Sequence, residues 1–121
     1  MPHCILEYSN NVLDVPDMRT LLQEINDTLA ATELFNRDDI KSRAIRHDLV
    51  VVGDGAPDRT FVTLTVQILS GRDDETKASL SDQTLAVLKR AFPQTLEKTR
   101  CSITVQIREI HRPSYRRVIS Y

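Results

Sequence analysis

The stretch MPHCILEY, residues 1–8, begins the chain and contains the first element of the expected fold. Its apolar centre, closed by the polar run Ser9-Asn10-Asn11, predicts a short strand from His3 to Tyr8. Pro2 directly follows the initiator Met1, and cells normally remove methionine in front of so small a residue. The new α-amino group would be a secondary amine, whose pKa can approach neutrality when its surroundings disfavour the charged form. Many proteins begin with Met-Pro for reasons of synthesis and turnover, so the dipeptide alone does not define a function.

The first strand is followed by signals for a helix and a second strand. Asp14 and Pro16 predict the start of a helix that runs to about Ala31. The second strand is expected from about Ile40 to Val52, and the composition of residues 53–58 predicts a turn. The helix carries an apolar stripe at spacings of three and four, formed by Met18, Leu21, Leu22, Ile25 and Leu29.

The second half of the chain repeats this plan. Residues 60–69 alternate as a strand, and three acids at positions 73–75 open a helix. Pro93 should end or kink that helix, and a last strand is expected from Ser102 to Ile110. The strand should bury Val62, Leu64, Val66 and Ile68, and the helix Leu85, Leu88, Phe92 and Leu96.

Two consecutive β-α-β units therefore define the expected fold, of the α+β (α/β-like) class. Strands joined by one crossover helix should be parallel, which gives a four-stranded mixed sheet with two helices on one face. We expect a single domain over residues 1–121, with pseudo-repeat halves of about 2–55 and 59–111 and a C-terminal arm at 112–121. The other sheet face is mixed in polarity, with Phe61, Thr63 and Thr65, which favours burial against other subunits.

The composition excludes several classes of function. A net charge of −1 and an aromatic content of 5 % argue against a nucleic-acid partner. No apolar run approaches the ~20 residues of a membrane span, and we expect a cytoplasmic protein. His3, His47 and His111 are far apart in the sequence, so no metal site is expected. Cys4 and Cys101 are expected to be small buried thiols.

Four separated motifs in the same order carry a family resemblance. They are Met1-Pro2-His3, NDTLAAT at 26–32, IKSR at 40–43, and Gly71-Arg72. From Pro2 to about His111 the chain resembles the 5-carboxymethyl-2-hydroxymuconate isomerase family of the tautomerase superfamily. The resemblance implies a tautomerase-like homotrimer that needs no cofactor. It also implies a small anionic unsaturated acid as substrate, a dienol turned into its conjugated keto isomer in bacterial homoprotocatechuate breakdown.

The same resemblance implies roles for four residues. Pro2, once Met1 is gone, would be the catalytic proton shuttle, and Arg72 would bind a substrate carboxylate. The family has arginine where this chain has Lys41, and arginine also at Arg43, so both are further candidates for substrate binding. Lysine keeps the charge but lacks the planar fork that grips a carboxylate with two bonds, which leaves the physiological substrate open.

Each candidate also has a structural explanation. Pro2 could be an inert first residue, and Lys41 and Arg43 could pair with nearby surface acids. For Arg72, a position at the positive end of a helix is unfavourable for a cation, which favours an anion-directed role. His3 and the adjacent Cys4 are expected to act in packing or in support of the site.

Two other functions stay open at this point. The chain could be a non-enzymatic trimeric binding or signalling module on the same scaffold. It could also catalyse another tautomerase-superfamily reaction on small unsaturated acids, although no acid stands out in the sequence for activating water. The C-terminal arm departs from the family pattern. We expect its basic residues Arg112, Arg116 and Arg117 to be solvated or to contact another subunit, and the arm could add an edge strand to a partner.

Overall fold

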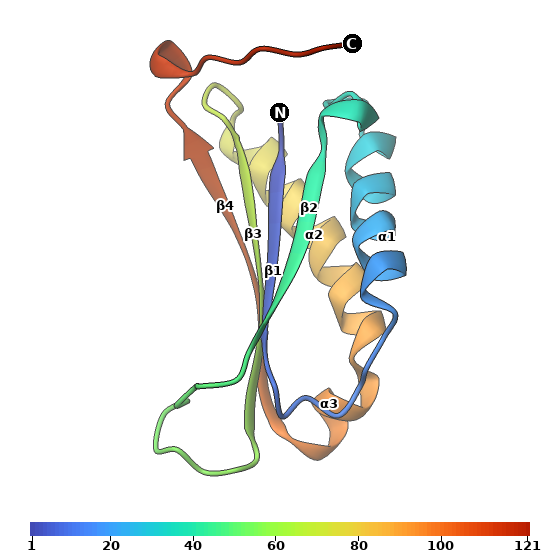
Figure 1. Cartoon of the computed structure of the whole chain (residues 1–121), viewed down its shortest axis with the longest axis vertical. Helices are drawn as coiled ribbons and strands as arrows, with labels where there is room; N and C mark the ends of the chain where they lie inside the picture. Colours follow the sequence, from blue (N-terminus) through green and yellow to red (C-terminus); the bar gives the residue numbers. More distant parts are fainter.

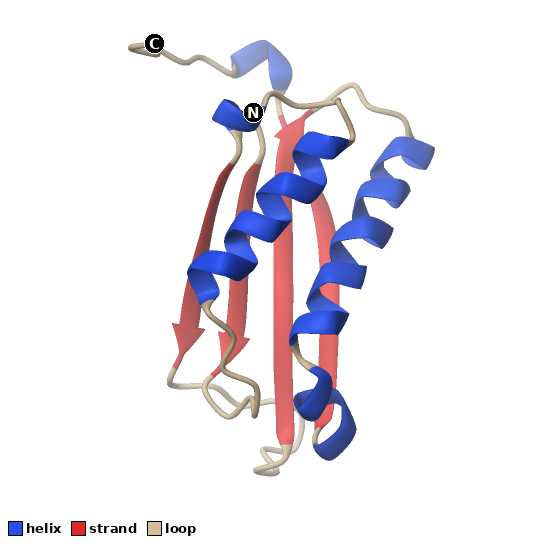
Figure 2. Cartoon of the chain, turned by 90° about the vertical axis from the view of Figure 1, so that its right-hand side faces the viewer, coloured by secondary structure: helices blue, strands red, loops and turns tan.

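In the computed structural model, which describes residues 1–121, two long helices cover one face of a four-stranded sheet (Figures 1 and 2). The strands lie in the order β2-β1-β3-β4. β1 is parallel to β2 and β3 is parallel to β4, whereas β1 and β3 are antiparallel. The predicted mixed sheet of two β-α-β units is therefore confirmed. The strands are β1 (His3–Ser9), β2 (Lys41–His47), β3 (Arg59–Leu69) and β4 (Arg100–Ile110), and the long helices are α1 (Met18–Ala31) and α2 (Asp74–Ala91).

Three short helices complete the chain. The 3-10 helix η1 (Arg37–Asp39) precedes β2, and α3 (Pro93–Lys98) connects α2 to β4. A second 3-10 helix, η2 (Arg112–Ser114), begins the C-terminal arm. No helix combines the length and the hydrophobicity that crossing a membrane requires.

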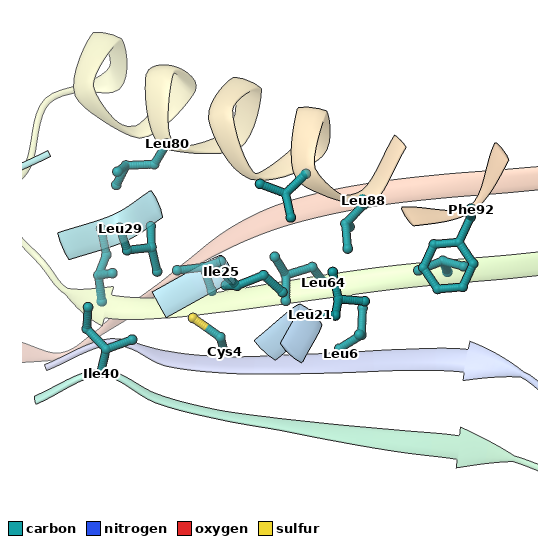
Figure 3. Close-up of a cluster of buried hydrophobic side chains, with 14 residues drawn as sticks. Cys4, Leu6, Leu21, Ile25, Leu29, Ile40, Leu64, Leu80, Leu88 and Phe92 are labelled. Carbon is teal, nitrogen blue, oxygen red and sulfur yellow. The ribbon is translucent and has the colours of Figure 1, made fainter. Parts of the chain in front are cut away.

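The core lies between the helices and the sheet face that they cover (Figure 3). Burying one Leu or Ile contributes about 1.5–3 kcal/mol, whereas an exposed ion pair contributes at most about 1 kcal/mol, so the apolar pattern sets the fold. The alternation predicted for β3 is confirmed by the burial of its four inward residues. The core consists of Cys4, Leu6, Leu21, Ile25, Leu29, Ile40, Val62, Leu64, Val66, Ile68, Leu80, Val87, Leu88 and Phe92.

Two element boundaries in the first half differ from the prediction. Helix α1 begins at Met18 with Asp17 as its N-cap, because the carboxylate of Asp14 is engaged elsewhere, by α3. Strand β2 ends at His47 and does not continue to residue 52. Its pairing with β1 stops where β1 itself ends, at Ser9 opposite His47, so the backbone beyond has no ladder to join.

In the second half, the predicted apolar face of α2 is partly wrong. Leu80 and Val87 point into the core with Leu88, whereas Leu85 is 39 % exposed and Leu96 is 38 % exposed. The reason is that α2 ends at Ala91 and Pro93 starts the separate helix α3, so Leu96 does not continue the α2 stripe. Cys101 is half-buried, unlike Cys4, because it lies on the edge strand β4.

Candidate active site

The candidate residues gather at one end of the sheet. β1 and β2 begin at this end and β3 ends there, beside the N-terminus in Figure 1. The backbone N–H of Lys41 donates to the carbonyl of Pro2 over 3.1 Å, and its ammonium lies 3.9 Å from the sulfur of Met1. Arg72 follows the end of β3 within a few residues. The topology therefore brings together residues that are up to 70 positions apart in the sequence.

Pro2 itself is buried, next to the first residue of β1. In this structure Met1 precedes Pro2, so the proline nitrogen is an amide and cannot titrate. A titratable amine arises at Pro2 only when Met1 is removed. The environment of the Met1 amino group therefore shows which charges act on the start of the chain.

Partial burial lowers the pKa of the Met1 amino group below its ordinary value, because it disfavours the ammonium form. The nearby carboxylate of Asp39 opposes this shift. Three cations lower the pKa further, in the order Arg117, Lys41 and Arg72. The start of the chain thus lies in a field with more cations than anions.

Arg72 is held by the segment that follows α1. One guanidinium nitrogen donates to the carbonyl of Leu34 over 2.9 Å, and the guanidinium carbon lies 5.4 Å from the centre of the Phe35 ring. Gly71 has φ +123°, a conformation that side chains disfavour, and this turn directs Arg72 back toward the sheet end. The carbonyl and the ring fix the cation without a carboxylate partner, which leaves its charge unneutralised.

Lys41 and Arg43 lie on the sheet face away from the helices. The side chain between them points the other way, since Ser42 donates to Asn26 of α1. The ammonium of Lys41 donates to the backbone carbonyl of Asp39 over 3.1 Å. Neither cation forms an ion pair with an acidic side chain, so the surface pairing considered from the sequence does not form.

Arg43 contacts His3, which the sequence predicted to act in packing or in support of the site. One of its guanidinium nitrogens lies 3.2 Å from Nδ1 of His3. Partial burial lowers the pKa of His3, and the charges of Arg43 and Lys41 lower it further. A neutral imidazole can accept the hydrogen bond from Arg43, so His3 supports the orientation of this cation.

Two residues of this end were missed by sequence reasoning, Asp39 and Arg117. The guanidinium of Arg117 donates to Oδ1 of Asp39 over 3.0 Å. The phenol of Tyr121 lies 3.4 Å from the same carboxylate oxygen. In Figure 1 the C-terminal arm crosses the end of the sheet near the N-terminus. The basic composition of the C-terminal arm does not predict where the arm packs on the fold. The one sequence feature that could have pointed to this pair is the position of Asp39, two residues before the candidate Lys41.

The single chain does not enclose these cations. The side chains of Lys41 and Arg43 are exposed at the sheet end. A hollow between α1 and α2 borders the segment that holds Arg72, because Leu34, whose carbonyl accepts from Arg72, lines it. The chain has no group of three or more His, Cys, Asp or Glu side chains that could hold a metal ion.

Two β-α-β units with an N-terminal proline and cations at one end of the sheet define a tautomerase-like protein. The family model for 5-carboxymethyl-2-hydroxymuconate isomerase matches residues 2–118, and the chain belongs to this family. It is 32 % identical over 111 residues to the 5-carboxymethyl-2-hydroxymuconate Delta-isomerase of Escherichia coli, covering 92 % of this chain and 88 % of that protein.

Solved structures show the same fold. A 5-carboxymethyl-2-hydroxymuconate isomerase from Deinococcus radiodurans R1 matches with a TM-score of 0.89 at 31 % identity, over 97 % of this chain and 88 % of that one. A fused 4-OT that forms a symmetric trimer matches with a TM-score of 0.64 at 16 % identity, over 90 % of this chain and 85 % of that one. The second similarity concerns the fold alone.

Proposed function

We propose that the chain, after loss of Met1, converts a dienol carboxylate of the 2-hydroxymuconate type into its conjugated keto isomer without a cofactor. The observation that carries the proposal is the position of Pro2 among the unneutralised cations of the sheet end. Membership in a family of isomerases supports it. Arg72, Lys41 and Arg43 would hold the substrate carboxylates.

The reaction needs a base that accepts the enol proton and an acid that returns a proton to carbon. The amine of Pro2 would accept the proton of the dienol O–H, which leaves a dienolate and a protonated amine. It would then give that proton to a carbon of the dienolate, which restores the amine. Burial and the cations that lower the pKa of the Met1 amino group would act on the Pro2 amine in the same direction. The cations would also stabilise the charge of the dienolate.

The environment of Asp39 favours isomerisation over the addition of water. A hydration would need a carboxylate that takes a proton from water, and Asp39 is the carboxylate whose charge acts on the N-terminal amino group. The hydrogen bond from Arg117 lowers the pKa of Asp39, and the charge of Arg117 and the N-terminus lower it further. A carboxylate with a lowered pKa is a weaker base. Asp39 therefore serves better to hold Arg117 than to activate water.

We further propose that the active form is a homotrimer. The sheet face away from the helices carries Thr63, Thr104 and Gln106 and is not covered by this chain. Packing against other subunits would cover this face and would enclose the exposed Lys41 and Arg43. The trimeric fused 4-OT with the same fold agrees with this arrangement.

The test is the conversion of 2-hydroxymuconate-type dienols by protein whose loss of Met1 has been verified by intact mass. Pro2→Ala still exposes a small residue for Met1 removal but offers a primary amine on a flexible residue. We expect kcat/KM to fall by about 10²-fold or more, the usual contribution of a positioned acid-base group. Protein that retains Met1 should be inactive. Full activity in either sample, or none in processed wild type, would overturn the proposal.

A further inference from the structure

The C-terminal arm, residues 112–121, is fixed across the end of the sheet at both of its ends. Near its start, Arg112 donates from its side chain to the carbonyl of Ser70 over 2.8 Å. At its far end, the phenol of Tyr121 contacts the carbonyl of Asp38 at 3.4 Å. Both views show the arm at the end of the molecule that holds the N-terminus (Figures 1 and 2). The arm is therefore part of the surroundings of the candidate site.

Between these two anchors, the guanidinium of Arg117 has N–H groups that make no hydrogen bond within the protein. Only its NH1 group is used, in the bond to Asp39, and the other two guanidinium nitrogens have no protein partner. The side chain of Arg117 is 39 % exposed, whereas that of Asp39 is 19 % exposed. The more buried carboxylate of Asp39 thus fixes the guanidinium of Arg117 through one nitrogen and leaves the other two nitrogens free to bind a ligand.

Asp39 also fixes Lys41. Its backbone carbonyl accepts from the ammonium of Lys41 over 3.1 Å, while its side chain holds Arg117. One residue therefore places two cations next to each other beside the start of the chain. The position agrees with the pKa of the Met1 amino group, on which the charge of Arg117 acts more strongly than that of Lys41 or Arg72.

We propose that Arg117 is a further substrate-binding residue, whose free N–H groups take a substrate carboxylate, and that Asp39 is its positioning residue. The inference rests on the proposed function. A muconate has two carboxylates and the carboxymethyl group adds a third, so such a substrate needs several cations. Lys41 offers a point charge, whereas a guanidinium binds a carboxylate with two parallel bonds. The arm would supply that fork next to the lysine.

The experiment compares Arg117→Ala and Arg117→Lys with Arg116→Ala in processed full-length protein. Arg116→Ala is a matched control, because it removes the same charge from the arm. The Arg116 side chain donates only to the carbonyls of Pro113 and Tyr115. The probes are 5-carboxymethyl-2-hydroxymuconate, with three carboxylates, and the enol of phenylpyruvate, with one.

For the tricarboxylate we expect Arg117→Ala to raise KM about tenfold or more and to leave kcat within about threefold, the loss of a charge-assisted pair. Its KM for the phenylpyruvate enol should change less than about twofold. Arg117→Lys should recover part of the tricarboxylate affinity, and Arg116→Ala should behave as wild type. Equal effects of Arg117→Ala and Arg116→Ala, or equal losses for both probes, would overturn the proposal.

Calorimetric binding of the tricarboxylate separates this inference from the isomerase function. If wild type binds the acid but does not convert it, the isomerase function fails, and the affinity of Arg117→Ala still decides the role of Arg117. An affinity equal to that of wild type, or no binding by wild type, would overturn the inference.

Discussion

The guanidinium of Arg72 stacks on Phe35, with its central carbon 5.4 Å from the ring centre. Phe35 belongs to the link after α1, whereas Arg72 stands just before α2, whose N-cap is Asp73. The positive end of a helix disfavours a cation, so this position requires compensation. The ring face and the carbonyl of Leu34 provide it. The two contacts fix the direction of the guanidinium.

From this contact we predict a graded loss of anion binding. Arg72→Ala should raise KM for dienol carboxylates about tenfold or more, since a charged hydrogen bond is lost. Phe35→Leu keeps an apolar side chain but removes the ring, and should raise KM only about two- to fivefold, the value of an exposed cation–π contact. Methyl esters of the same substrates should be unaffected by either change.

The control for this series is Arg19→Ala, because the Arg19 side chain is exposed and makes no hydrogen bond or ion pair. Steady-state kinetics on acids and esters gives the comparison. Equal losses on acids and esters would mean that Arg72 supports the fold and not the binding of anions.

A second prediction concerns the protonation of His3. Its pKa is lowered from 6.5, mainly by partial burial and further by the charges of Arg43 and Lys41. Since the folded state binds the proton less well than the unfolded state, this group costs stability as pH falls below about 6.5. Arg43→Gln should raise the pKa of His3 toward its ordinary value, and Arg46→Gln should not.

Proton NMR titration of the imidazole signals measures this pKa, and His3→Gln identifies the signal. A pKa of His3 that is the same in wild type and Arg43→Gln would contradict the contact between the two side chains.

A third prediction tests the uncovered sheet face. The hydroxyls of Thr63 and Thr104 are 2.9 Å apart on this face. If other subunits cover it, Thr63→Glu would bury an unpaired carboxylate, which costs several kcal/mol. Sedimentation at micromolar concentration should give a trimer for wild type and a monomer for Thr63→Glu. Ala86→Glu, on the exposed side of α2, should stay trimeric. A monomeric wild type or a trimeric Thr63→Glu would refute the proposed assembly.

The sequence predicts those parts of the fold in which the apolar pattern of a single helix or strand determines which of its side chains are buried. The alternation of β3 and the stripe of α1 each bury their own apolar residues, so a local pattern is sufficient. The site depends on contacts between distant residues that leave no local pattern. Arg117 and Asp39 are 78 positions apart, and their pairing follows from where the arm crosses the sheet end. Lys41, Arg43 and Arg72 are predicted from family motifs and not from periodicity, and Pro2 is a candidate from the Met-Pro start together with those motifs.

A contact between distant residues also explains why α1 begins later than the sequence predicts. Asp14 has the sequence features of an N-cap, but its carboxylate accepts from the backbone N–H of Thr95 at 2.7 Å and from the Thr95 hydroxyl at 2.6 Å. The two residues are 81 positions apart. Asp14 thereby joins the segment before α1 to the first turn of α3.

From this contact we predict a pH-dependent contribution to stability. Burial acts to raise the pKa of Asp14, but the hydrogen bonds from Thr95 and Gln94 lower it more, so its pKa lies below the ordinary value. A carboxyl group with a lowered folded pKa stabilises the fold above its unfolded pKa of about 3.9, and this stability is lost as pH falls through the folded pKa. Asp14→Asn keeps an acceptor but loses the charge, so it should lower the free energy of unfolding at neutral pH by about 1–2 kcal/mol.

Urea unfolding between about pH 3 and about pH 7 measures this effect, and the difference between wild type and Asp14→Asn should shrink as the carboxylate becomes protonated. Asp82→Asn is the matched control, because Asp82 lies exposed on α2 and its side chain has no hydrogen-bond partner. It should change stability by less than about 0.5 kcal/mol at any pH. A constant difference across the range would show that Asp14 acts through its shape alone, since only a charged carboxylate gives stability that depends on pH in this direction.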